Sequence, residues 1–134
     1  MSAISEGDLV TVEPEYFENT KPGHSKFWEV IVENNDYIAL YGVIGKLGSK
    51  SVKKFNDHAE ARAHAMDMIR DKLRNGYVKT NRPLTRLNAY ITCPMLVVST
   101  HVRLPYEDCV ECLGPNGLVK FSSNRLTIVS KKEE

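Results

Sequence analysis

The sequence predicts an α+β fold, in which an antiparallel sheet packs on one long helix and a small all-β part follows. Short stretches rich in β-branched and aromatic residues recur along the chain, separated by Gly, Pro, Asn and Asp. One stretch, residues 57–75, has helical periodicity instead. The 134 residues, 42% hydrophobic and 26% charged, have the size and balance of a compact globular domain with a small satellite unit.

Four short strands are expected before the helix: residues 9–12, 26–33, 37–44 and 50–55. Residues 13–25 are expected to form a loop, since this stretch holds Pro14, Pro22 and Gly23. The polar turn at 34–36 is short, so the strands on either side of it should pair as a hairpin. The strand at 50–55 carries three lysines and is expected to present a basic face to water.

The helix is predicted over residues 57–75. Asp57 with Glu60 three residues later forms a capping-box-like start, and Gly76 suits the position after the last turn. His58 and His64 are expected to face solvent. The apolar residues that follow helical spacing predict the face toward the sheet: Ala59, Ala63, Met66, Ile69 and Leu73.

The last third of the chain is expected to be all-β, with short strands separated by turn residues: residues 89–92, 95–102, 109–113, 118–121 and 126–129. Pro115-Asn116-Gly117 favours a hairpin between two of them. This part is similar to the second half of an SH3-like or KOW-type barrel. Residues 7–13 could complete such a barrel, which leaves the middle of the chain as an insertion; the alternative is that the last third extends the central sheet.

The middle of the chain carries an ordered set of motifs: Lys26-Phe27-Trp28-Glu29 on a strand, Tyr41-Gly42-Val43-Ile44-Gly45 on the next, and Lys72 to Tyr77 at the end of the alanine-bearing helix. In order and spacing, residues 24–80 resemble the WGR domain, which accompanies poly(ADP-ribose) polymerases and also occurs in small bacterial proteins. The resemblance divides the chain into an acidic N-terminal strand and loop (1–23), a WGR-like domain (24–80) and a C-terminal β lobe (81–134).

The family's Trp-Gly-Arg signature is replaced here by Tyr41-Gly42-Val43. In the family, the Trp packs on a sugar at a DNA end and the Arg holds a phosphate. Tyr41 keeps an aromatic face for stacking, but Val43 has no donor for a phosphate. The expected contact face combines Tyr41 with the lysines of the hairpin and its neighbouring strand: Lys26, Lys46, Lys50, Lys53 and Lys54. Lys79, Arg82 and Arg86 could extend it.

Catalysis, a cofactor and a metal are not expected. The sequence has no Gly-x-Ser-x-Gly elbow and no phosphate-binding glycine loop, and the resemblance supplies no active site. An alternative zinc site would use Cys93, His101, Cys109 and Cys112, although Cys109 and Cys112 also fit an ordinary strand as small apolar residues.

Charge is unevenly distributed although the net charge is +1. Residues 1–20 carry five acidic and no basic residues, whereas residues 21–86 carry thirteen Lys and Arg against seven Asp and Glu. A central positive field favours a polyanion as partner. We therefore expect a non-catalytic, largely sequence-independent nucleic-acid-binding protein, with DNA preferred over RNA. The alternative is an adaptor or inhibitor that docks on a nucleic-acid-processing protein.

The sequence has no signal-peptide pattern, and no apolar run approaches the roughly 18 residues that a membrane span requires. The three cysteines are too few for a disulfide scaffold. We expect a cytoplasmic protein, nucleoid-associated if it binds DNA. The sequence does not indicate the oligomeric state.

Overall fold

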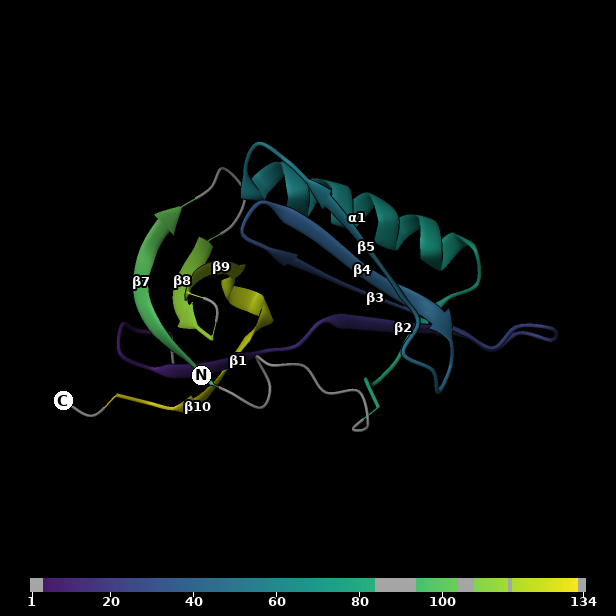
Figure 1. The fold of residues 1–134 in the computed structure, drawn as a ribbon, viewed down its shortest axis with the longest axis horizontal. Helices are drawn as coiled ribbons and strands as arrows, with labels where there is room; N and C mark the ends of the chain where they lie inside the picture. Colours follow the sequence, from purple (N-terminus) through teal and green to yellow (C-terminus); the bar gives the residue numbers. More distant parts are fainter. Residues whose placement is uncertain (1–3, 84–93, 104–107, 116, 133–134) are drawn as a thin grey trace. The chain divides into compact units, whose positions relative to one another are not determined.

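The computed structural model describes residues 4–83, 94–103, 108–115 and 117–132. The chain divides into two compact units, each with its own five-stranded antiparallel sheet. Pro14–Arg86 form the central unit, and Met1–Glu13 with Leu87–Glu134 form the terminal unit. The fold is mostly β, with one α-helix in the described residues, and the sheet-plus-helix central unit agrees with the α+β prediction (Figure 1).

The central sheet has the strand order β5-β4-β3-β2-β6. Its strands are β2 (Glu15–Asn19), β3 (Lys26–Glu33), β4 (Asp36–Val43), β5 (Ser49–Lys54) and β6 (Val78–Lys79). The predicted hairpin is confirmed, since β3 and β4 pair along their whole length from Lys26↔Val43 to Glu33↔Asp36. Asn34 in the turn has a φ of 56°, a conformation that Asn tolerates better than most residues.

The stretch predicted as a loop at 13–25 contains strand β2, so that prediction is wrong. Tyr16 and Phe17 are both buried, because they point to opposite faces of the sheet and both faces are covered at this strand. Phe17 lies opposite Trp28 of β3 with their ring centroids 5.5 Å apart. The Pro and acidic residues around this stretch give it the sequence pattern of a loop. Its strand conformation is instead determined by pairing with β3.

Helix α1 (His58–Arg74) covers one face of the central sheet (Figure 1). Its predicted ends are confirmed: the Asp57 side chain accepts a hydrogen bond of 2.8 Å from the Glu60 N–H, and Gly76 beyond the last turn has a φ of 96°. The predicted apolar stripe is mostly wrong: Ile69 is buried and Ala59 is half-buried, but Ala63, Met66 and Leu73 are exposed. Alanines at many positions make two faces of the helix equally apolar, and packing selects the one with His58, Ala61, Ala65 and Ile69.

The terminal sheet has the order β10-β1-β7-β8-β9. Its strands are β1 (Leu9–Val12), β7 (Met95–Arg103), β8 (Asp108–Gly114), β9 (Gly117–Ser122) and β10 (Leu126–Ser130), with a 3₁₀ turn, η1 (Ser123–Arg125), before the last strand. Because β1 lies between β7 and β10, the first strand of the chain belongs to this sheet and the central unit is inserted after it. The predicted strand at 89–92 lies outside the described residues.

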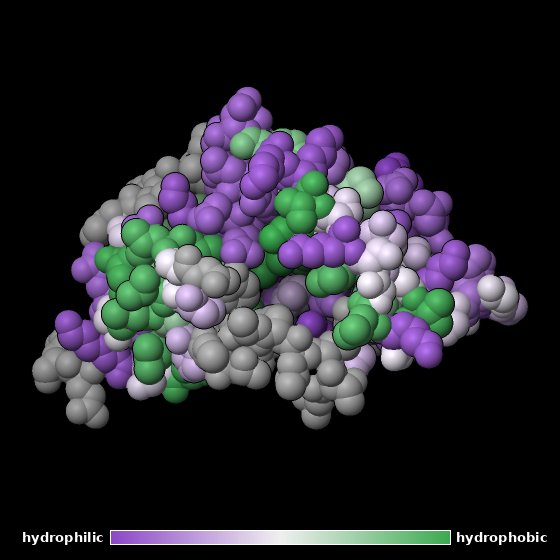
Figure 2. All heavy atoms as spheres, viewed as in Figure 1, coloured by the Kyte–Doolittle hydropathy of each residue, from purple (hydrophilic) through white to green (hydrophobic). Residues whose placement is uncertain are grey.

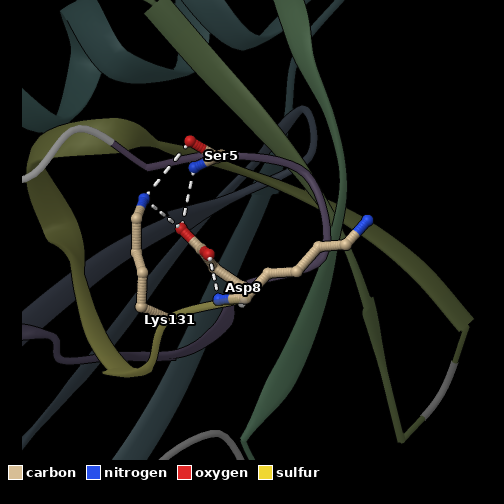
Figure 3. Close-up of polar contacts among 4 residues, drawn as sticks. Ser5, Asp8 and Lys131 are labelled. Atoms are coloured by element: carbon tan, nitrogen blue, oxygen red, sulfur yellow. Dashed lines mark hydrogen bonds and ion pairs between the residues drawn. The ribbon is translucent and has the colours of Figure 1, made fainter. Parts of the chain in front are cut away.

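Within the terminal unit, Asp8 connects the segment that precedes β1 with the segment that follows β10 (Figure 3). Its buried carboxylate accepts hydrogen bonds from Ser5 N–H (2.8 Å), Lys132 N–H (2.9 Å) and the Lys131 ammonium (2.9 Å). Among the described residues, no helix has the length and apolar character needed to cross a membrane.

Candidate nucleic-acid interface

An open groove of about 630 Å³ lies on the helix-covered face of the central sheet. Strand pairing explains its composition, because directly opposed residues of neighbouring strands point to the same face. Trp28 is paired with Tyr41, and Tyr41 with Ser49, so all three face the groove side of the sheet. Met68 of α1 and Tyr77, just after it, line the groove from the other side.

Tyr41 is the most exposed aromatic residue of this groove, with 44% of its surface accessible. Gly42 and Gly48 pack closely beside it where β4 turns into β5. Gly48 has a φ of 79°, and a Cβ atom there would lie 2.4 Å from the Tyr41 carbonyl oxygen and 2.7 Å from Cζ of Phe27. The two glycines therefore let the backbone close tightly around Phe27 while the Tyr41 ring remains accessible from solvent.

Three lysines from three elements border the groove: Lys26 of β3, Lys53 of β5 and Lys72 of α1. The Lys72 ammonium lies 5.7 Å from the Trp28 ring centroid and 5.2 Å from that of Tyr77, within the range of a cation–π contact. Lys53 lies 5.4 Å from the centre of Phe55. Sequence reasoning assigned Lys72 only to the helix end; its spacing from Ala61, Ala65 and Ile69 is the signal that would have placed it here.

The lysines expected to form one face are divided between two. Lys53 is paired with Tyr37 and shares the groove face, but Lys50 is paired with Leu40 and Lys54 with Asp36, on the opposite face. Lys54 also forms a 3.3 Å ion pair with Asp36. Lys46 lies in the turn between β4 and β5. The expectation of a single basic face on this strand is therefore wrong, because alternate residues of a strand point in opposite directions.

Of the residues considered as extensions of the contact face, Arg82 and Lys79 have other partners. Arg82 donates to Glu29 at 2.7 Å in a buried ion pair, which removes it from the surface. Lys79 lies 3.7 Å and Arg62 3.6 Å from the Glu15 carboxylate, so part of the acidic N-terminal charge is taken up within the central unit. Arg86 lies outside the described residues.

His64 was predicted to face solvent, but its side chain lines the groove. Its ring meets Tyr37 edge-on at 4.6 Å and lies 5.1 Å from Phe55. Burial, and then the nearby Lys53 ammonium, lower the pKa of His64, with Asp67 opposing the shift. His58, also predicted to face solvent, is buried, and its Nδ1 is hydrogen-bonded to the Asn34 carbonyl oxygen.

The alternative zinc site gains no support from the described residues, where no group of His, Cys, Asp and Glu could hold a metal. Cys109 and Cys112 are both buried on β8, three positions apart and hence on opposite faces of the strand. Burial raises the pKa of Cys112 to about 11, which keeps it a thiol. Cys93 and the His101 side chain lie outside what the structure describes.

An exposed hairpin, a covering helix and an aromatic–lysine groove define a domain of the class that binds nucleic acids or other proteins. Residues 14–83 match the model of the WGR domain, and the chain, more than half of which this match covers, belongs to that family. The match begins before the predicted residue 24 and takes in β2, which the sequence resemblance did not reach.

A crystal structure of a protein from Bacteroides fragilis is similar to this chain, with 33% sequence identity and a TM-score of 0.50. The similarity covers 52% of this chain but only 20% of the other, so the chain matches about a fifth of that protein's length. A comparison with curated proteins finds no match.

Proposed function

We propose that the central unit binds nucleic acid without catalysing a reaction, and that it prefers DNA to RNA and recognises little sequence. The observation that carries the proposal is the accessible Tyr41 ring in one groove with Lys26, Lys53 and Lys72. An aromatic face stacks on a base or sugar, and ammonium groups attract phosphates and release counterions. In a bacterial cell, such binding would place the protein on the nucleoid.

This proposal differs from a general attraction to a basic strand, because only one face of β5 contributes to the groove. Lys53 is expected to contact phosphate together with Lys26, whereas Lys50 and Lys54 are on the other side of the sheet. The chain therefore contains a matched control for its own binding site: two lysine pairs of equal charge, one on each face.

Binding of labelled duplex, nicked and single-stranded oligonucleotides, and of an RNA duplex, is measured by fluorescence anisotropy over a range of salt concentrations. Lys26→Gln with Lys53→Gln should weaken binding and reduce the slope of log K against log salt by about two. Lys50→Gln with Lys54→Gln should change both far less. Equal effects of the two pairs, or no binding at low salt, would overturn the proposal.

A second candidate function is protein interaction, which the apolar tip of the β4–β5 hairpin favours. Val43 is 55% and Leu47 89% exposed, and neither side chain can bind a phosphate. The partner in this case would be a nucleic-acid-processing protein that buries the tip. If no oligonucleotide binds, immobilised protein should retain such a partner, identified by mass spectrometry, and Leu47→Asp should abolish its retention.

For the terminal unit we infer an SH3-like barrel. The support is its antiparallel strand order, β10-β1-β7-β8-β9, with a 3₁₀ turn between β9 and β10. In an SH3-like barrel the two edge strands of this sheet, β9 and β10, would approach each other as the sheet curves. An experimentally determined structure in which the sheet is instead flat and open would contradict the inference.

A further inference from the structure

Four leucines lie side by side across four adjacent strands of the terminal sheet. Leu9 of β1 is paired with Leu96 of β7, Leu96 with Leu113 of β8, and Leu113 with Leu118 of β9. Directly opposed residues share a face of the sheet, so the four side chains form one continuous row. We call these four residues the leucine row.

The leucine row faces away from the core of the terminal unit. Leu9, Leu96, Leu113 and Leu118 are 38, 39, 48 and 58% exposed. Their neighbours along the same strands, such as Val10, Cys112 and Val119, are buried on the opposite face. Figure 2 shows apolar side chains at the surface in the part of the molecule where Figure 1 shows β7 and β8.

Such a surface is unusual on the outer face of a sheet, where polar residues normally alternate with the buried ones. Single exposed leucines are common, but a contiguous apolar row across several strands marks an interaction site. The row belongs to the terminal unit, so neither the groove of the central unit nor the proposed nucleic-acid binding accounts for it.

The residues next to the row indicate what covers it. Glu111 lies two positions before Leu113, and Lys120 two positions after Leu118, so both are on the same face as the leucines. Glu111 and Lys120 are directly opposite each other on β8 and β9, so one acidic and one basic residue lie next to each other beside the leucine row. A two-fold axis that runs along the strands between β8 and β9 brings Glu111 of one copy toward Lys120 of the other and Leu113 toward Leu118, so this part of the face is complementary to itself in charge as well as in apolarity.

We propose that the leucine row is the interface of a homodimer, in which the terminal sheets of two copies pack face to face. Leu113 and Leu118 of the two copies interdigitate around the two-fold axis, while Leu96 and Leu9 lie at the edge of the contact. Glu111 and Lys120 flank the central leucines with reciprocal charges. One row of leucines with two charged residues is narrower than an interface of standard size, roughly 800 Å² per partner. The dimer is therefore expected to be weak and to form reversibly with concentration.

Sedimentation velocity of the full chain over a wide concentration range tests the proposal. The wild-type protein should shift from monomer toward twice the monomer mass as concentration rises. Leu113→Lys should raise the dissociation constant by at least about tenfold, because it places a charge in the centre of the interface. Leu73→Lys, an equal change at an exposed leucine of the central unit, should leave the dissociation constant unchanged.

A charge exchange provides a second test that retains every leucine. Glu111→Lys should weaken the dimer, since lysines then face each other, and the double variant Glu111→Lys with Lys120→Glu should restore it. A wild type that remains monomeric throughout, dimerisation unaffected by Leu113→Lys, or a double variant as weak as the single one would overturn the proposal. Oligonucleotide binding measured on Leu113→Lys separates this result from the proposed function, because monomers should still bind.

Discussion

Arg82 donates a hydrogen bond of 2.7 Å to Glu29, and the two side chains are only 6 and 1% exposed. Glu29 lies on β3 and Arg82 follows β6, so the pair fixes the end of the central unit to its middle strand. Charges so deeply buried are stable only when paired, since each alone would lose its hydration without compensation.

Arg82→Ala is predicted to lower the free energy of unfolding of the central unit by about 3–5 kcal/mol, because it leaves the Glu29 carboxylate buried without its partner. Urea unfolding followed by Trp28 fluorescence measures this loss. The double variant Glu29→Leu with Arg82→Met should recover most of the stability, since no buried charge remains. A loss below about 1 kcal/mol for Arg82→Ala would contradict the prediction.

Asp8 predicts an acid-sensitive terminal unit. Hydrogen bonds from Lys132 N–H, the Lys131 ammonium and Ser5 N–H lower the pKa of Asp8 from 3.8 to about 2. Because the folded-state pKa is below the unfolded one, the network stabilises the fold fully above pH 3.8 and loses its contribution as pH falls toward 2. The protection of the β1 and β10 amides against hydrogen exchange, relative to unfolded chain at the same pH, should therefore decrease over this range.

In Asp8→Asn, that acid dependence should disappear, with faster exchange of β1 and β10 already at neutral pH. Glu6→Gln, at an exposed neighbouring position, serves as the control and should retain the wild-type pH profile. If Asp8→Asn and the wild type show the same dependence between pH 4 and pH 2, Asp8 is not the group responsible.

Gly48→Ala is predicted to destabilise the central unit by about 2–4 kcal/mol, as the sum of left-handed backbone strain and overlap in a packed site. The overlap arises because the added Cβ would lie within 2.4 Å of the Tyr41 carbonyl oxygen. Gly45→Ala is the matched control: its φ is 90°, but nothing lies within 4 Å of the added Cβ, so strain alone should cost about 1 kcal/mol. Thermal unfolding distinguishes the two, and equal losses would refute the packing argument.

Val43→Arg is predicted to strengthen DNA binding about tenfold, or about 1.5 kcal/mol, because it supplies the phosphate donor that the WGR signature has at this position. The slope of log K against log salt should become steeper by about one. Val52→Arg adds the same charge on the opposite face of the sheet, at a similarly exposed position, and should have a much smaller effect. Comparable gains for both variants would indicate a nonspecific charge effect.

Helix α1 shows which features of a helix its sequence pattern can predict and which it cannot. Its ends follow from local chemistry, because Asp57 caps the first turn and Gly76 adopts the positive φ that ends the helix. The face that packs on the sheet was not predictable, since alanines are spread around the helix and a small side chain fits either side. The cation–π position of Lys72, the burial of His58 and the position of His64 at the groove depend on that face and were missed with it.

The candidate site shows the same division. Tyr41 is exposed on the predicted hairpin, but the lysines around it are not the predicted set, because the side on which each lysine lies depends on strand register. Of the expected lysines, Lys26 and Lys53 line the groove with Tyr41, whereas Lys50 and Lys54 lie on the opposite face of the sheet.

The sequence by itself determined the local elements, namely the β3–β4 hairpin, the capped helix and the family of the central unit, because these depend on neighbouring residues and on the order of motifs. Only the tertiary structure decided that β1 joins β7 and β10 across the inserted central unit, and which side chains meet at the groove and in the leucine row. Those relations join residues far apart in the chain. They are determined by burial and by pairing between strands that are far apart in the sequence, and a local sequence pattern contains no information about either.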